Sequence, residues 1–166
     1  YTQEELESYF QFHLPPLAEE LGLSSKELLA ELKTRYNGYR FSVIPQKVYN
    51  PTSILYAFFE MRLADYWFST GTPTFLVNLI KSREYYIPKI ENLSLKESLT
   101  VYDLNNLDPV ALLLQTGYAT IKDYRDGLYI LDYPNQEVKV AFTEQLLLSY
   151  LSPNDRHETA NSVYKL

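Results

Sequence analysis

Apolar residues recur at helical spacing through the first 36 residues of the chain. The segment Thr2–Glu5 has the pattern of a capping box at a helix start, and Ser24-Ser25-Lys26-Glu27 marks the start of another helix. Apolar residues follow both segments at three- and four-residue intervals, and a proline pair separates them. We therefore expect three short helices, the last ending at Asn37-Gly38, where glycine suits the left-handed conformation that closes a helix.

The spacing of apolar residues changes from helical to alternating after this glycine. Residues 39–43 alternate between apolar and polar, and Val48-Tyr49 follow after a short gap, so a short hairpin is expected there. Asn50-Pro51 then combines a capping residue with a proline suited to the first turn of a helix. These signals predict a fourth helix that runs to about residue 60.

The final third of the chain has the clearest pattern. Asp108-Pro109 precedes a run of apolar residues that predicts a helix closing near Thr116-Gly117. Two alternating segments then flank Asp126-Gly127, a dipeptide typical of a tight hairpin turn. Pro134-Asn135 predicts the start of a long helix. Helix, hairpin and helix in this order resemble a winged-helix unit.

These elements predict a mainly helical α+β fold with two structured parts. We expect a helical subdomain with a short hairpin over residues 1–83 and an irregular connection over 84–107. A winged-helix-like subdomain is expected over 108–151, followed by a tail or linker over 152–166.

Composition narrows the classes of protein to which the chain can belong. It has 166 residues, of which 46% are hydrophobic, and no run of about 18 apolar residues occurs, so disorder and a membrane span are not expected. The lack of cysteine excludes disulfides and thiolate metal sites and suits a reducing compartment such as the cytoplasm. The net charge of −6 disfavours a surface built on nucleic-acid phosphates. Because the chain starts at Tyr1, we expect it to be part of a longer protein.

The sequence contains neither of the common nucleotide-binding glycine patterns, Gly-x-x-x-x-Gly-Lys and Gly-x-Gly-x-x-Gly. Its histidines, His13 and His157, are isolated, so neither is expected to bind a metal. Asp132, Glu137 and Lys139 match the Asp…Glu-x-Lys pattern of metal-dependent nucleases, in which two carboxylates hold Mg²⁺. The helix start between them would turn Asp132 away. We therefore expect Glu137 to lie in a solvated first turn favoured by the helix dipole, with no metal site.

Three groups of residues could contact ligands. Arg40 lies between two aromatic residues, either stacked on the surface or in contact with an anion such as a phosphate. Thr70, Gly71 and Thr72 precede a proline at an expected helix start, where free amides could bind an anion. Lys122 and Arg125 lie on the hairpin and could contact nucleic acid, although three aspartates share that hairpin.

Five motifs occur in the order found in a bacterial AAA-ATPase-like family, and the resemblance extends from about Tyr1 to Leu151. Full-length members of this family carry a C-terminal PD-(D/E)XK nuclease-like domain. The motifs are Tyr36-Asn37-Gly38-Tyr39-Arg40-Phe41, Val48-Tyr49-Asn50-Pro51, the segment from Tyr66 to Leu76, Gln115-Thr116-Gly117-Tyr118 and Tyr133-Pro134-Asn135-Gln136-Glu137-Val138.

The resemblance implies that this chain is the middle region of such a protein: a helical lid followed by the winged-helix-like part. The nucleotide-binding P-loop core would lie upstream and the nuclease-like carboxylates downstream. ATP and Mg²⁺ are then expected only in the full-length protein, and no catalytic residue is expected here. The resemblance also suggests that Arg40 reaches the nucleotide phosphates, as a lid arginine does in related ATPases.

Two functions follow as hypotheses. The first is a non-catalytic coupling region that closes over a nucleotide bound by the P-loop core and links it to the nuclease-like domain. The alternative is a free-standing winged-helix-like module that binds a protein partner or, less in keeping with its charge, nucleic acid.

Overall fold

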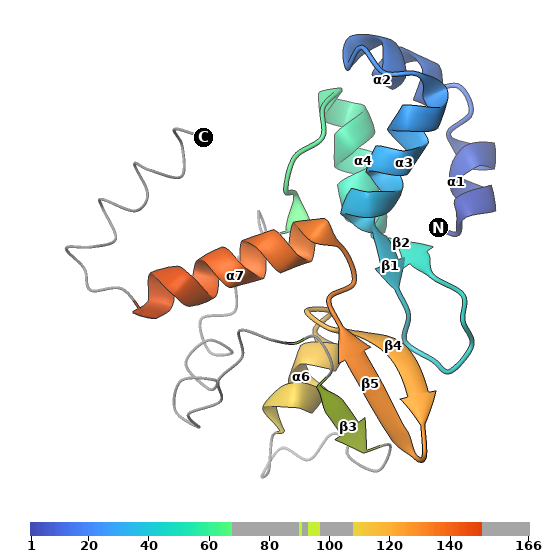
Figure 1. Cartoon of the computed structure of the whole chain (residues 1–166). Coiled ribbons are helices and arrows are strands. Elements are labelled where there is room, and N and C mark those ends of the chain that lie inside the picture. The colour runs from blue at the N-terminus through green and yellow to red at the C-terminus, as the bar shows by residue number, and fades with distance from the viewer. Residues whose placement is uncertain (68–89, 91–92, 97–107, 151–166) are drawn as a thin grey trace.

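The computed structural model describes residues 1–67, 90, 93–96 and 108–150 and shows a mixed fold of helices and small antiparallel sheets (Figure 1). This confirms the expected α+β class. In chain order the elements are α1 (Gln3–Tyr9), α2 (Leu14–Glu20), α3 (Ser25–Tyr36), β1 (Asn37–Tyr39), β2 (Val48–Tyr49), α4 (Pro51–Glu60), β3 (Ser94–Lys96), α6 (Pro109–Gln115), β4 (Thr120–Arg125), β5 (Leu128–Asp132) and α7 (Gln136–Tyr150).

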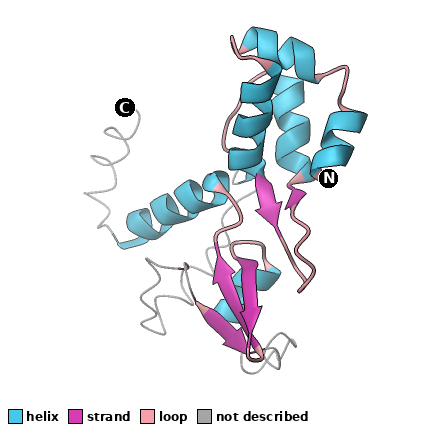
Figure 2. Ribbon diagram, turned by 45° about the vertical axis from the view of Figure 1, so that its right-hand side comes forward, coloured by secondary structure: helices cyan, strands magenta, loops and turns pink. Residues whose placement is uncertain are grey.

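Helices α1 to α4 gather into one group at the N-terminal end of the molecule (Figure 2). Two capping boxes form there, the expected one at Thr2 and another at Ser24: the Thr2 hydroxyl accepts a hydrogen bond from the Glu5 amide at 3.2 Å, and the Ser24 hydroxyl accepts one from the Glu27 amide at 3.3 Å. The apolar faces of these helices form a core whose fully buried members include Leu6, Leu17, Leu28, Leu32 and Ile54.

The first hairpin is shorter than the alternating pattern predicts. Only Asn37–Tyr39 and Val48–Tyr49 pair as strands. Phe41, Val43 and Ile44 lie in the connecting loop and are half or more exposed, so the alternation does not continue as a half-buried strand.

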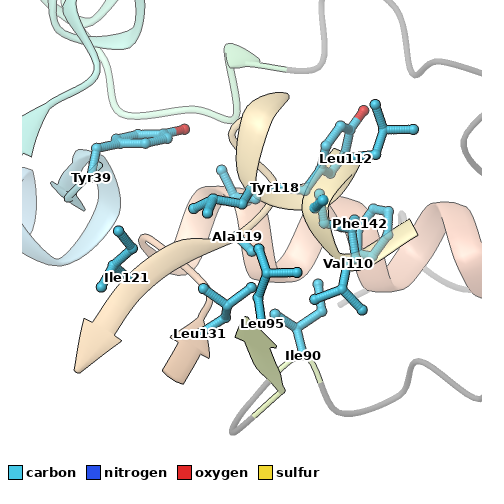
Figure 3. Close-up of a cluster of buried hydrophobic side chains, with 14 of the residues drawn as sticks. Tyr39, Ile90, Leu95, Val110, Leu112, Tyr118, Ala119, Ile121, Leu131 and Phe142 are labelled. Atoms are coloured by element: carbon cyan, nitrogen blue, oxygen red, sulfur yellow. The ribbon is translucent and has the colours of Figure 1, made fainter. Parts of the chain in front are cut away.

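The second group of elements is a three-stranded antiparallel sheet, in the order β3-β5-β4, packed with α6 and α7. Figure 3 shows its buried side chains converging from the sheet and both helices, among them Leu95, Leu131 and Phe142. Strand β3 lies within residues 84–107, for which only an irregular connection was expected. Three residues are too short for a periodic signal, and β3 is fixed by its pairing with β5.

The tight turn of the second hairpin is confirmed. Asp126 and Gly127 both have positive φ, at 52° and 77°, which is the backbone conformation of a type I′ turn. Within the described part of the chain, none of the helices is both long and apolar enough to cross a bilayer.

Candidate functional site

A buried carboxylate lies where the two groups of elements meet. The Glu137 side chain at the start of α7 is 1% exposed. Its Oε1 accepts hydrogen bonds from the backbone amides of Tyr66 at 2.6 Å and Trp67 at 2.8 Å, and its Oε2 accepts one from the Ser53 hydroxyl at 2.8 Å. We call Ser53, Tyr66, Trp67 and Glu137 the joint, because they tie α4 and the segment after it to α7.

Local structure places the donors of the joint. Asn50 caps α4 by accepting from the amides of Thr52 and Ser53, which fixes the first turn that carries the Ser53 hydroxyl. The Tyr36 hydroxyl accepts from the Ala64 amide at 3.0 Å and donates to the Ala64 carbonyl at 2.8 Å. This pair of bonds anchors the chain just before Tyr66.

The expectation that Glu137 lies in a solvated first turn is wrong. The amides that bind it belong to residues 70 and 71 positions earlier in the chain. No local pattern around Glu137 reveals those partners. An acidic residue in the first helical turn is normally exposed, and this one is buried only because α7 lies against α3, the start of α4 and the segment after α4.

Burial raises the pKa of Glu137 above its ordinary value, and the charge of nearby Asp65 adds to the effect. The hydrogen bonds from Trp67, Ser53 and Tyr66 act in the opposite direction, because they stabilise the ionised form. Desolvation is the larger effect. The three hydrogen-bond donors therefore hold the carboxyl group in place, while burial disfavours its ionised form.

This balance predicts a pH dependence of stability. Because the folded protein holds the Glu137 proton more tightly than the unfolded chain does, the contribution of Glu137 to stability decreases as the pH rises from about 4.5 toward its raised folded-state pKa. Burial also raises the pKa of Asp65, which contributes in the same direction. Urea unfolding of the wild type and Glu137→Gln at pH 4.5, 5.5, 6.5 and 7.5 should show the variant gaining stability relative to the wild type across this range. A constant difference would contradict the prediction.

Arg40 makes a second connection between the two groups. Its backbone amide donates to the Thr120 hydroxyl at 2.6 Å, and its carbonyl accepts from the Ile121 amide at 3.0 Å, so the chain after β1 runs against β4. Its guanidinium donates to the carbonyls of Ser42 and Ile44, both at 2.9 Å, of Lys122 at 3.1 Å, and of Val43.

These bonds give Arg40 a structural role that neither sequence interpretation included. The guanidinium organises the loop between β1 and β2 and attaches it to the hairpin of β4 and β5. The contact of Arg40 with nucleotide phosphates stays a prediction.

The other candidate ligand-binding residues lie apart from the joint. The Lys122 ammonium pairs with the Asp132 carboxylate at 3.1 Å, and the Arg125 guanidinium donates to the Asp123 carboxylate at 2.6 Å. Each cation of the hairpin thus has an acidic neighbour, and the contact of these cations with nucleic acid stays a prediction. Thr70, Gly71 and Thr72 lie outside the described residues.

The nuclease-like pattern is not assembled in space. Asp132 faces Lys122, whereas Glu137 is enclosed by the joint, and the Lys139 ammonium lies 5.9 Å from the centre of the Tyr133 ring. Among the residues that the structure describes, no three acidic, histidine or cysteine side chains come together as a metal site.

A small cavity opens beside the joint and was not foreseen from the sequence. It measures about 290 Å³ and is formed by the end of β1, the loop after it, the start of α4, Trp67 and the end of α6. We call it the notch; its lining residues are Tyr39, Phe41, Val48, Tyr49, Asn50, Pro51, Trp67, Gln115, Thr116 and Gly117. They come from four segments, which only the folded chain brings together.

Comparison with known proteins finds a relative that matches most of the chain. No protein-family model and no solved structure matches the chain. In an alignment of 156 positions that covers 91% of the chain, the chain is 35% identical to a protein of Azotobacter chroococcum mcd 1 named "Uncharacterized protein in vnfD 5'region". The chain spans 28% of the length of that relative.

Proposed function

We propose that this chain is a non-catalytic coupling region of a larger, cytoplasmic AAA-ATPase-like protein. In this proposal it closes over ATP and Mg²⁺ held by an upstream P-loop core and transmits the closure to a downstream nuclease-like domain. The observation that carries the proposal is the joint, in which one buried carboxylate binds groups from α4 and from the segment that follows it.

The joint suits a region that transmits movement. The two groups of elements have separate hydrophobic cores, so each can move as a unit. Between them, the hydrogen bonds of Glu137 and the backbone contacts of Arg40 with β4 restrict the relative position of the two units. Buried hydrogen bonds tolerate little displacement without loss, so movement of one unit is passed to the other.

The strand order supports the winged-helix part of the proposal. In a winged helix, the strand before the helices pairs with the second strand of the hairpin. Here β3 pairs with β5, β5 pairs with β4, and α6 precedes the hairpin. The paired cations Lys122 and Arg125 favour a protein contact over a nucleic-acid contact for this hairpin.

Two further observations support placing the chain within a longer ATPase. The five ordered motifs resemble the AAA-ATPase-like family, and the sequence contains no P-loop of its own. The similar Azotobacter protein extends well beyond the region that this chain matches.

The proposal predicts that the chain alone does not hydrolyse ATP, whereas the longer protein does. In the longer protein, a non-hydrolysable ATP analogue should slow amide hydrogen exchange on both sides of the joint, in α4 and in α7. Ser53→Ala, which removes one bond of the joint, should reduce the protection of α7 by about twofold or more. Ser42→Ala changes an exposed residue of the same type outside the joint and should leave the protection unchanged. ATP hydrolysis by the chain alone, or protection confined to α4, would contradict the proposal.

A further inference from the structure

We propose that the notch binds an uncharged planar heteroaromatic ring of about the size of a purine base. The proposal stands on the shape and chemistry of the notch and does not depend on the proposed coupling function. A volume of about 290 Å³ is near the lower limit of about 300 Å³ for small-molecule sites. The notch therefore has room for a flat ring system of this size.

Aromatic side chains form two sides of the notch. Gly117 lies between them: a β-carbon at this position would lie 3.5 Å from Tyr39 Cε1 and 3.6 Å from Trp67 Cζ2. These are ordinary van der Waals distances, so both rings lie directly beside the glycine. A flat ligand placed over the glycine contacts both rings, and base–aromatic contacts of this kind are largely independent of which base is bound.

Phe41 gives the notch an exposed aromatic edge. Its ring is 59% exposed and stacks on Tyr39, with ring centres 5.8 Å apart and an angle of 24° between the planes. Arg40 holds the loop that carries Phe41 through hydrogen bonds to three of its carbonyls. The Phe41 ring therefore offers an accessible aromatic surface at the notch.

The polar groups of the notch favour an uncharged ligand. Its lining includes the side chains of Asn50, Gln115 and Thr116 but no charged residue. A heterocycle with ring nitrogens or a carbonyl can form hydrogen bonds with such amide side chains, whereas a phosphate finds no cation in the lining.

The test uses the fluorescence of Trp67, which is the sole tryptophan of the chain and lines the notch. Titration of the 166-residue chain with adenosine should quench this emission saturably, whereas ribose should not. Phe41→Ala should weaken adenosine binding about tenfold, and Phe41→Tyr should restore it. Because Phe41 is exposed, neither variant should unfold the protein. Phe12→Ala changes a phenylalanine that is 80% exposed and outside the notch, so it should bind adenosine like the wild type.

Adenosine monophosphate tests the charge of the site. Because the lining has no cation, it should bind within about twofold of adenosine at 0.15 M salt. Absence of saturable quenching, equal losses in Phe41→Ala and Phe12→Ala, or at least tenfold tighter binding of the monophosphate would each overturn the proposal. None of these results bears on ATP hydrolysis by the longer protein, so the two proposals fail separately.

Discussion

Replacing Glu137 with alanine should lower the free energy of unfolding of this protein by about 3–5 kcal/mol. The substitution leaves the amides of Tyr66 and Trp67 and the hydroxyl of Ser53 without their acceptor. A buried polar group without a partner costs about 1–3 kcal/mol, and the three groups lie in one enclosed place where water does not readily replace the carboxylate. Urea unfolding followed by circular dichroism at pH 7 measures the loss.

Two further variants separate the causes of this loss. Glu137→Gln keeps a carbonyl oxygen for the two amides and offers an N–H to the Ser53 hydroxyl. It should therefore remain within about 1 kcal/mol of the wild type at pH 7, since burial already disfavours the charge. Glu144→Ala removes an exposed glutamate from the same helix and should change stability by less than about 0.5 kcal/mol. An equal effect of Glu137→Ala and Glu144→Ala would show that the joint does not stabilise the fold.

Replacing Gly38 with alanine should be similarly damaging, at about 2–5 kcal/mol, for a steric reason. Gly38 has φ of 125°, and a β-carbon there would overlap the carbonyl group of Pro134, which is backbone and cannot rotate away. The strained φ costs about 1–2 kcal/mol and the displaced backbone about 1–3 kcal/mol more. The displacement moves the segment that leads into α7, so it also disturbs Glu137.

Gly127→Ala provides the matched control for Gly38→Ala. Gly127 also has positive φ, at 77°, but a β-carbon there would meet no atom within 4 Å. Alanine at this position should cost only the strain of about 1–2 kcal/mol. Thermal or urea unfolding of both variants therefore isolates the clash with Pro134. If both variants lost the same free energy of unfolding, the backbone at Pro134 would have to move aside at no cost in free energy.

The starts of α1, α3 and α6 and the turn of the second hairpin were predictable because short-range contacts fix them. Ser24 and Glu27 bond to each other across three positions, and Asp108 accepts from the amides two and three residues ahead of it. The turn at Asp126-Gly127 depends only on the φ angles that these two residues adopt. Such signals can be read from neighbouring letters of the sequence.

The contacts that make the candidate sites were not predictable in this way. Arg40 and Thr120 are 80 positions apart, and Ser53 and Glu137 are 84 apart. Strand β3 has only three residues, and its place is set by β5. In the sequence, the acidic and aromatic residues of these sites have the same pattern as those of an exposed helix turn or loop. Only their distant partners distinguish them.

The sequence by itself thus determined the described helices, the tight second hairpin and the α+β class, since each depends on hydrogen bonds and apolar faces within a few residues. Only the tertiary structure decided that Glu137 is buried, that Arg40 holds a loop and that Tyr39, Phe41 and Trp67 surround a cavity. Each of these outcomes requires segments that are distant along the chain to pack together. The cost of burying polar groups then selects the arrangement that supplies their partners.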